Sequence, residues 1–299
     1  LGGTSDQIID AVSQAWVDGQ SLRTYRHSPN AGSRKSWAAG DATSRAVRLA
    51  LITLSGEMGY PGALSAPTWG FEDVSFGGKK LVLSQPLGSY VMENVLFKIS
   101  FPAEFHAQTA VEAAVTLHSQ IINRLDDITK IEVTTHESAI RIISKSGALN
   151  NPADRDHCLQ YMIAIGLIHG DLIAEHYEDD VASDPRVDAL REKMTIHEDK
   201  RYTQEYLEAD KRSIANRIQI FFNDGSSTEV VEVEYPIGHK RRRVEGIPVL
   251  EQKFKNNLLK SFDVSVVDKI LAKCLDQESL EAMSVLDFQA MLVVEKNSF

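Results

Sequence analysis

The sequence has few cysteines, no long apolar run and no excess of positive charge. Its two cysteines, Cys158 and Cys274, cannot supply a four-thiolate zinc site or three thiolates for an iron–sulfur cluster. No apolar run approaches the roughly 20 residues that a membrane-spanning helix needs. The net charge is −10, from 32 Lys and Arg against 42 Asp and Glu, which argues against a nucleic-acid binder. We therefore expect no metal, no membrane and no nucleic acid.

What remains is ordinary globular composition over 299 residues, with 43% hydrophobic and 25% charged residues. The length predicts one large or two medium domains. The charge is uneven, because residues 171–210 hold 13 acids against five bases. The charged residues within 23–48 are mostly cations, and residues 240–243 are four consecutive cations. The negative balance therefore belongs mainly to one segment.

Residues 1 to about 60 have a helical pattern. Thr4 and Gln7 form a predicted capping box ahead of an apolar face, and Gly32-Ser33 opens a second helix that ends at Gly56. Many small residues in the second helix predict that it is buried on several sides. A capped helix at the very start of the sequence also suggests that this chain is part of a longer one.

Helix and strand signals mix in the middle of the chain. Predicted elements are a helix from Pro102 to about 125, a strand over 131–134, a helix over 155–169 closed by Gly170, an acidic helix from Pro185 and a hairpin of 214–222 with 229–234. From Leu250 onward the pattern is helical again. We predict an α+β fold: a mostly helical main domain in residues 1–93 and 239–299, with an α+β lid domain inserted as residues 94–238.

Two clusters carry residue types that acid–base or anion-binding chemistry uses. Arg23, Arg26 and His27 precede Lys35 at the next helix start, where they either bind a carboxylate or form a solvated basic loop. Lys98, Glu104 and His106 converge near another helix start, where Glu104 is either a general acid–base group or only a first-turn acid.

Two further segments add candidates. In Asp154-Arg155-Asp156-His157 the first acid is best explained as a helix cap, while the role of His157 stays open. The run that contains Arg241 is typical of a solvated or nucleic-acid-facing segment, but its place at a domain crossing favours a small-anion site. Nucleotide-binding, zincin and α/β-hydrolase motifs are absent from the sequence.

Five ungapped blocks resemble the MmgE/PrpD family, and the resemblance extends over essentially the whole chain. They are Ala15–His27 (AWVDGQSLRTYRH), Lys35–Ala42 (KSWAAGDA), Glu93–His106 (ENVLFKISFPAEFH), Asn150–His157 (NNPADRDH) and Glu234–His239 (EYPIGH). The resemblance implies a helical domain with an inserted lid, a homodimer, and a lyase that dehydrates 2-methylcitrate to 2-methyl-cis-aconitate in the methylcitrate cycle of propionate catabolism. No cofactor and no iron–sulfur cluster are expected. A tricarboxylate is the expected ligand.

The resemblance also assigns roles. Lys35 and Lys98 correspond to active-site lysines, and His27, His106 and His157 fall in or beside segments that line the pocket. The expected catalytic set is Lys98, His106, Lys35 and Glu104. Substrate binding is expected of Arg23, Arg26, His27, His157 and Arg241.

Three alternatives stay open at this point. Glu104 replaces a histidine found in the related cis-aconitate decarboxylase, so decarboxylation on the same fold competes with dehydration. The chain looks like the C-terminal three-fifths of a family member, so it could be an inactive piece that needs an N-terminal partner segment. The expected location is the mitochondrial matrix if the source is eukaryotic and the cytoplasm if it is bacterial.

Overall fold

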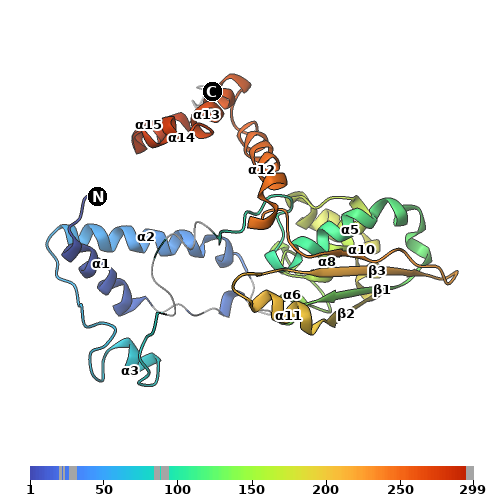
Figure 1. The fold of residues 1–299 in the computed structure, drawn as a ribbon, viewed down its shortest axis with the longest axis horizontal. Coiled ribbons are helices and arrows are strands. Elements are labelled where there is room, and N and C mark those ends of the chain that lie inside the picture. The colour runs from blue at the N-terminus through green and yellow to red at the C-terminus, as the bar shows by residue number, and fades with distance from the viewer. Residues whose placement is uncertain (20–21, 23, 27–31, 84–87, 89–93, 294–299) are drawn as a thin grey trace.

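The computed structural model describes residues 1–19, 22, 24–26, 32–83, 88 and 94–293. A four-stranded sheet with covering helices forms one part of the molecule, and helical segments precede and follow it in the chain (Figure 1). The predicted α+β class is therefore confirmed. Among the described helices, none is long and apolar enough to cross a bilayer.

The N-terminal segment contains helices α1 (Ser5–Asp18), α2 (Arg34–Leu54) and α3 (Phe71–Ser75) and the 3₁₀ turn η1 (Thr24–Arg26). The capping box is confirmed, since the Thr4 hydroxyl accepts from the Gln7 N–H and the Gln7 amide oxygen accepts from the Thr4 N–H. The expectation that α2 is buried on several sides is wrong. Thr53 is the one buried residue of α2. Helix α1 packs along one side of α2, and most of the other α2 side chains face solvent.

The sheet has the strand order β2-β1-β3-β4, formed by β1 (Ile128–Thr135), β2 (Met194–Glu198), β3 (Asn216–Phe222) and β4 (Val231–Val233). β1 runs parallel to β2 and antiparallel to β3. The predicted hairpin is confirmed, because β3 and β4 are antiparallel neighbours. The sequence did not predict β2, because this strand is only five residues long and lies inside the acidic segment 171–210.

The hydrophobic core lies between this sheet and two helices, α5 (Gln108–Ile121) and α8 (Leu159–His169). β3 alternates buried and partly exposed residues, and its Ile218 and Ile220 join Val111 and Leu117 of α5 in the core. Residues 159–168 are all buried, so α8 needs apolar side chains on every face and shows no amphipathic period. Gly170, with φ of +66°, ends α8 as predicted.

Two predicted helices are divided in the structure. The helix expected from Pro102 begins instead with Glu104 capping the 3₁₀ turn η2 (Phe105–Ala107), and α5 ends in the 3₁₀ segment η3 (Ile122–Asp127). The helix expected over 155–169 is split into α7 (Pro152–Arg155) and α8, because Cys158 between them has extended backbone. The cap of α7 is Asn151, not Asp154. Both breaks lie beside the candidate site.

The remaining elements complete the two parts. Around the sheet are α6 (Glu137–Ile143), η4 (Ala174–Tyr177), α9 (Asp179–Ala182), α10 (Pro185–Glu192) and α11 (Lys200–Leu207). The chain then leaves the sheet through η5 (Lys240–Arg242), α12 (Arg243–Leu258), α13 (Val264–Cys274), α14 (Gln277–Glu281) and α15 (Val285–Met291). Figure 1 shows α12 to α15 extending away from the sheet as the C-terminal segment.

The chain enters and leaves the sheet-containing part at one place, where Phe97 and Gly238 lie against each other. The Phe97 N–H donates to the Gly238 carbonyl at 3.1 Å. A Cβ on residue 238 would lie 1.7 Å from the Phe97 carbonyl oxygen. Only glycine therefore fits this crossing without moving the backbone.

We predict that Gly238→Ala lowers the free energy of unfolding by about 3 kcal/mol, because the added methyl group overlaps a backbone atom. Gly40→Ala is the matched control, since a Cβ there meets nothing within 4 Å and the position is helical. That control should gain about 0.5–1 kcal/mol. Chemical denaturation of both variants checks this, and equal stabilities would contradict it.

Candidate active site

A cavity of about 720 Å³ lies where the start of α2 meets the sheet-containing part. Its lining combines four residues at the start of α2 with residues far along the chain. The four are Gly32, Ser33, Lys35 and Ser36, and the others are Pro102, Asn151, Pro152, Ala153, Asp156, Ala174, Tyr177 and Glu178. Segments separated by more than 100 positions therefore form one concave surface. This is the usual setting of a small-molecule site.

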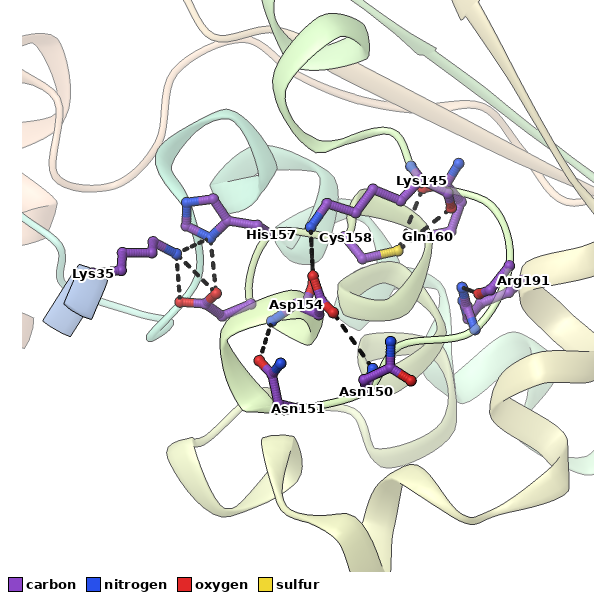
Figure 2. A network of polar contacts seen from close by, with 11 residues as sticks. Lys35, Lys145, Asn150, Asn151, Asp154, His157, Cys158, Gln160 and Arg191 are labelled. Carbon is purple, nitrogen blue, oxygen red and sulfur yellow. Dashed lines mark hydrogen bonds and ion pairs between the residues drawn. The ribbon is translucent and has the colours of Figure 1, made fainter. Parts of the chain in front are cut away.

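Lys35 is the charged centre of this cavity. Its Nζ donates to Asp156 Oδ1 at 3.0 Å and to Oδ2 at 3.3 Å, and it also contacts His157 Nδ1. His157 Nδ1 lies 2.8 Å from Asp156 Oδ1. Figure 2 shows the Lys35 side chain reaching from α2 toward His157. The three groups thus form a closed triangle of polar contacts.

The protonation states of this triangle follow from burial and charge. Burial lowers the pKa of Lys35, and the neighbouring Asp156 carboxylate opposes this shift only in part. Burial alone would raise the pKa of Asp156, but the hydrogen bond and charge of His157, together with Lys35, lower it below its usual range. Asp156 therefore stays a carboxylate, while Lys35 releases its proton more readily than an exposed lysine does.

His157 Nδ1 cannot satisfy both neighbours at once. If it carries a proton it donates to Asp156, and if it does not it accepts from the Lys35 ammonium. A proton taken up or lost at this triangle therefore changes two hydrogen bonds together. A lysine of lowered pKa beside an imidazole and a carboxylate is suited to general acid–base chemistry.

Hydrogen bonds of the neighbouring residues hold the turn that carries Asp156 and His157. Asn151 Oδ1 accepts from the Asp154 N–H at 3.0 Å, and Pro152 stands at the first helical position of α7. Lys145 Nζ lies 3.3 Å from Asp154 Oδ1. Figure 2 shows Asp154 beside the triangle, between Lys145 above it and Asn151 below it. Asp154 thus positions the turn, and the structure gives it no direct contact with Lys35.

A second chain of polar groups lies close by, in the segment that begins at Glu104. His106 Nδ1 lies 2.8 Å from both Glu104 carboxylate oxygens, and its Nε2 lies 3.2 Å from the Tyr206 hydroxyl of α11. His136 stacks on the Tyr206 ring with centroids 4.5 Å apart. Neither ring nitrogen of His136 has a hydrogen-bond partner among the described residues. Glu104, His106 and Tyr206 thus form a linear relay.

The electrostatics of this relay are set by burial. Burial would raise the pKa of Glu104, but the hydrogen bonds and charge of His106 lower it, so Glu104 is ionised. Burial also raises the pKa of Tyr206, which keeps its hydroxyl protonated. Burial, assisted by His106, lowers the pKa of His136 to about 4, so His136 is neutral near pH 7. Glu104 also acts electrostatically on Lys35 and His157, which connects the relay to the triangle.

The other predicted site residues are placed differently. The Lys98 side chain is exposed, with Nζ 5.2 Å from the centre of the Phe105 ring, and Lys98 does not line the 720 Å³ cavity. Arg241 donates to the Asp210 carbonyl at 2.9 Å and lies over the Tyr235 ring. Neither residue contacts Lys35 in the described structure. Arg26 ends η1, its side chain lies outside the described set, and so do Arg23 and His27 entirely.

Three residues of the site received no role from the sequence. Asp156 lies within a motif that had been singled out, and its contact with Lys35 across 121 positions has no local signal. Tyr206 and His136 lie on α11 and at the start of α6, in segments without a recognisable motif. Only the fold brings them to His106.

Fold and site together define a class: α+β proteins with a cavity that pairs a lysine with a carboxylate and an imidazole for acid–base chemistry. Residues 101–277 match the MmgE/PrpD C-terminal domain, and residues 1–84 match the MmgE/PrpD N-terminal domain. The chain belongs to the MmgE/PrpD family. It includes sequence from both domains of the family.

Several curated relatives are very similar to this chain. It is 60% identical over 297 residues to the 2-methylcitrate dehydratase of Escherichia coli strain K12, covering 98% of this chain and 62% of the relative. It is 60% identical over 275 residues to the mitochondrial 2-methylcitrate dehydratase of Yarrowia lipolytica, covering 91% of this chain and 53% of the relative. The chain therefore spans between about half and two-thirds of the length of these relatives.

We predict that His136 makes stability depend on pH. The unfolded imidazole titrates near 6.5 and the folded one near 4, so between these values the unfolded state binds the proton and the fold loses stability as the pH falls. The loss amounts to about 3 kcal/mol across this window. Denaturation of the wild type and of His136→Phe at pH 7 and at pH 4 measures the difference. A stability difference between the two proteins that does not change with pH would contradict this assignment.

Proposed function

We propose that this protein dehydrates 2-methylcitrate to 2-methyl-cis-aconitate, as part of the methylcitrate cycle of propionate catabolism. The observation that carries the proposal is the Lys35–Asp156–His157 triangle at the wall of a large cavity. The names of relatives 58–60% identical to the chain support the choice of substrate. The substrate is a tricarboxylate, so cations are needed at the site.

The reaction needs one base and one acid. A base removes a proton from the carbon next to a carboxylate, the electron pair of that C–H bond forms the C=C bond, and the C–O bond of the neighbouring hydroxyl breaks. An acid protonates the departing oxygen, so the second product is water. A cation close to the adjacent carboxylate stabilises the negative charge that develops there.

The described residues divide these tasks between two groups. We propose that Lys35 and His157 exchange protons with the substrate, since the lowered pKa of Lys35 and the shared His157 nitrogen allow a proton to move within the triangle. Asp156 holds both groups in place. Glu104 and His106, with Tyr206 bound to His106, form the second acid–base group, and Arg23, Arg26, His27 and Arg241 remain the proposed ligands of the substrate carboxylates. Lys98, first expected in the catalytic set, is now proposed as a further cation for them, because its side chain is exposed and does not line the large cavity.

The proposal extends to architecture. Residues 94–238 act as a lid inserted between helical segments 1–93 and 239–299, and the active protein is a homodimer. The contact of Lys35 in α2 with Asp156 beside α7 supports a site between the two parts. The proposed location is the mitochondrial matrix or the cytoplasm, according to the source. The mitochondrial name of the Yarrowia relative is consistent with the first.

The direct test is to incubate the purified protein with 2-methylcitrate in the presence of a chelator. We expect ultraviolet absorbance to rise as the conjugated C=C bond forms, because the proposed side-chain route needs no metal ion. No rise with folded protein would refute the proposal. Carbon dioxide released from cis-aconitate would instead indicate decarboxylation on the same fold.

We predict that Lys35→Gln lowers kcat by at least about 100-fold, because it removes a proton-transferring group. Lys200→Gln is the control, since the Lys200 side chain is 86% exposed and pairs only with Glu198 in the described structure. Steady-state kinetics with a thermal-melting check for folding measures this. Equal kcat in the two variants would remove Lys35 from the mechanism.

We predict a smaller effect for Tyr206→Phe, of about tenfold in kcat, because it removes the partner of His106 but leaves the pair with Glu104. The pH profile distinguishes positioning from simple packing, since loss of this hydrogen bond should shift the kcat profile. An unchanged kcat and pH profile would show that Tyr206 is only a structural residue.

A further inference from the structure

A second cavity, of about 310 Å³, includes Tyr206 in its lining and lies where the chain leaves the sheet-containing part. Its polar lining consists of Asn94, Tyr206, Arg212, His239 and Lys240, and Ile214 is among the apolar lining residues. None of the described residues that line it is a carboxylate, although Glu234 acts electrostatically on His239. Two cations therefore face one concave space whose described lining holds no acid.

Arg212 and Lys240 are also not neutralised elsewhere. Neither forms a salt bridge with a carboxylate in the part of the chain that the structure describes, whereas Arg242 of the same run pairs with Glu112. Lys240 Nζ donates to Asn94 Oδ1 at 2.8 Å, which leaves two ammonium protons for another acceptor. Arg212 makes one long contact, 3.4 Å to the Tyr206 carbonyl. Both cations keep donors for a ligand.

His239 adds a neutral donor to the same cavity. It is 2% exposed, and its Nδ1 accepts from the Arg241 N–H at 3.2 Å. Burial and the charges of Arg241, Lys240 and Arg243 lower the pKa of His239 to about 4, so the ring is neutral near pH 7. Since Nδ1 is an acceptor, the ring proton is on Nε2. No described residue accepts from that Nε2–H.

We propose that this second cavity is an anion-binding site for a small carboxylate or phosphate group, held by Arg212, Lys240 and the Nε2–H of His239. Two cations and a neutral N–H donor, with no acid among the described lining residues, match an oxyanion with several acceptor atoms. The chain as a whole carries a charge of −10, so an anion gains little from its general surface and binds where cations are concentrated. The site is distinct from the Lys35 cavity, and the proposal does not depend on the proposed function.

The test follows the imidazole ¹⁵N signals of histidine-labelled protein during titration with inorganic phosphate and, separately, with citrate. We expect a saturable shift of the His239 Nε2 signal in at least one titration, and the tighter of the two ligands identifies the class. His169 serves as an internal reference, because it is exposed and stacks on His176 far along the chain from residue 239. A His239 signal that moves in neither titration would overturn the proposal.

Charge removal provides the second arm. The double variant Arg212→Asn and Lys240→Gln should bind the preferred anion at least about tenfold more weakly by calorimetry. Asn suits position 212, where φ is +46°, because asparagine tolerates left-handed backbone. Lys200→Gln should bind as the wild type does. Lys35→Gln should keep the His239 shift even if it abolishes turnover, which separates this site from the proposed catalytic one. Unchanged affinity in the double variant would refute the assignment.

Discussion

The contact of Lys35 with Asp156 and His157 is the interaction on which the candidate site depends. It joins the first turn of α2 to the turn between α7 and α8, and no other pair of described residues brings a lysine into the large cavity. A half-buried ion pair of this kind adds little net stability, because desolvation offsets most of the attraction. Its value is positional, since it holds an ammonium group, an imidazole and a carboxylate within hydrogen-bond distance.

The helices α7 and α8, which flank Asp156 and His157, are held by local capping and by buried hydrogen bonds. Asn151 caps α7, Pro152 begins it, and the buried Arg155 donates to the Tyr177 carbonyl and to Asp179. Tyr177 in turn lines the cavity. The turn with Asp156 and His157 is therefore attached on one side to a capped helix and on the other to the fully buried α8. A rigid support of this kind fixes the direction of both side chains toward α2.

How much of this the sequence could predict varies with the range of the interactions. The capping box at Thr4, the hairpin of β3 and β4 and the end of α8 at Gly170 depend on neighbouring residues, so they were predictable. The burial of α2 was predicted wrongly, because small residues permit close packing on several sides but α1 is the helix that packs along it in the described structure. Lys35, Glu104, His106 and His157 were named from their residue types and family blocks.

The long-range partners were beyond the reach of sequence patterns. Tyr206 meets His106 across 100 positions, and Asp156 meets Lys35 across 121. Such pairs depend on how α2, α7 and α11 are placed by the core, and no local periodicity records that placement. For the same reason the sequence of the cationic run at 240–243 did not predict that its members have different partners. Arg242 binds Glu112, Arg241 binds a backbone carbonyl, and Lys240 lines the second cavity.

The distribution of charge gives the two cavities different chemistry. The large cavity has its lysine compensated by Asp156, so it favours proton transfer, whereas the smaller one leaves Arg212 and Lys240 uncompensated, so it favours binding of an anion. Tyr206 connects the two groups of residues, because its hydroxyl contacts His106 and Tyr206 also lines the second cavity. A ligand in the second cavity would therefore lie one side chain away from the Glu104–His106 pair. Any displacement of Tyr206 on binding would change the hydrogen bond of His106, which gives the smaller cavity a direct physical route to the acid–base groups.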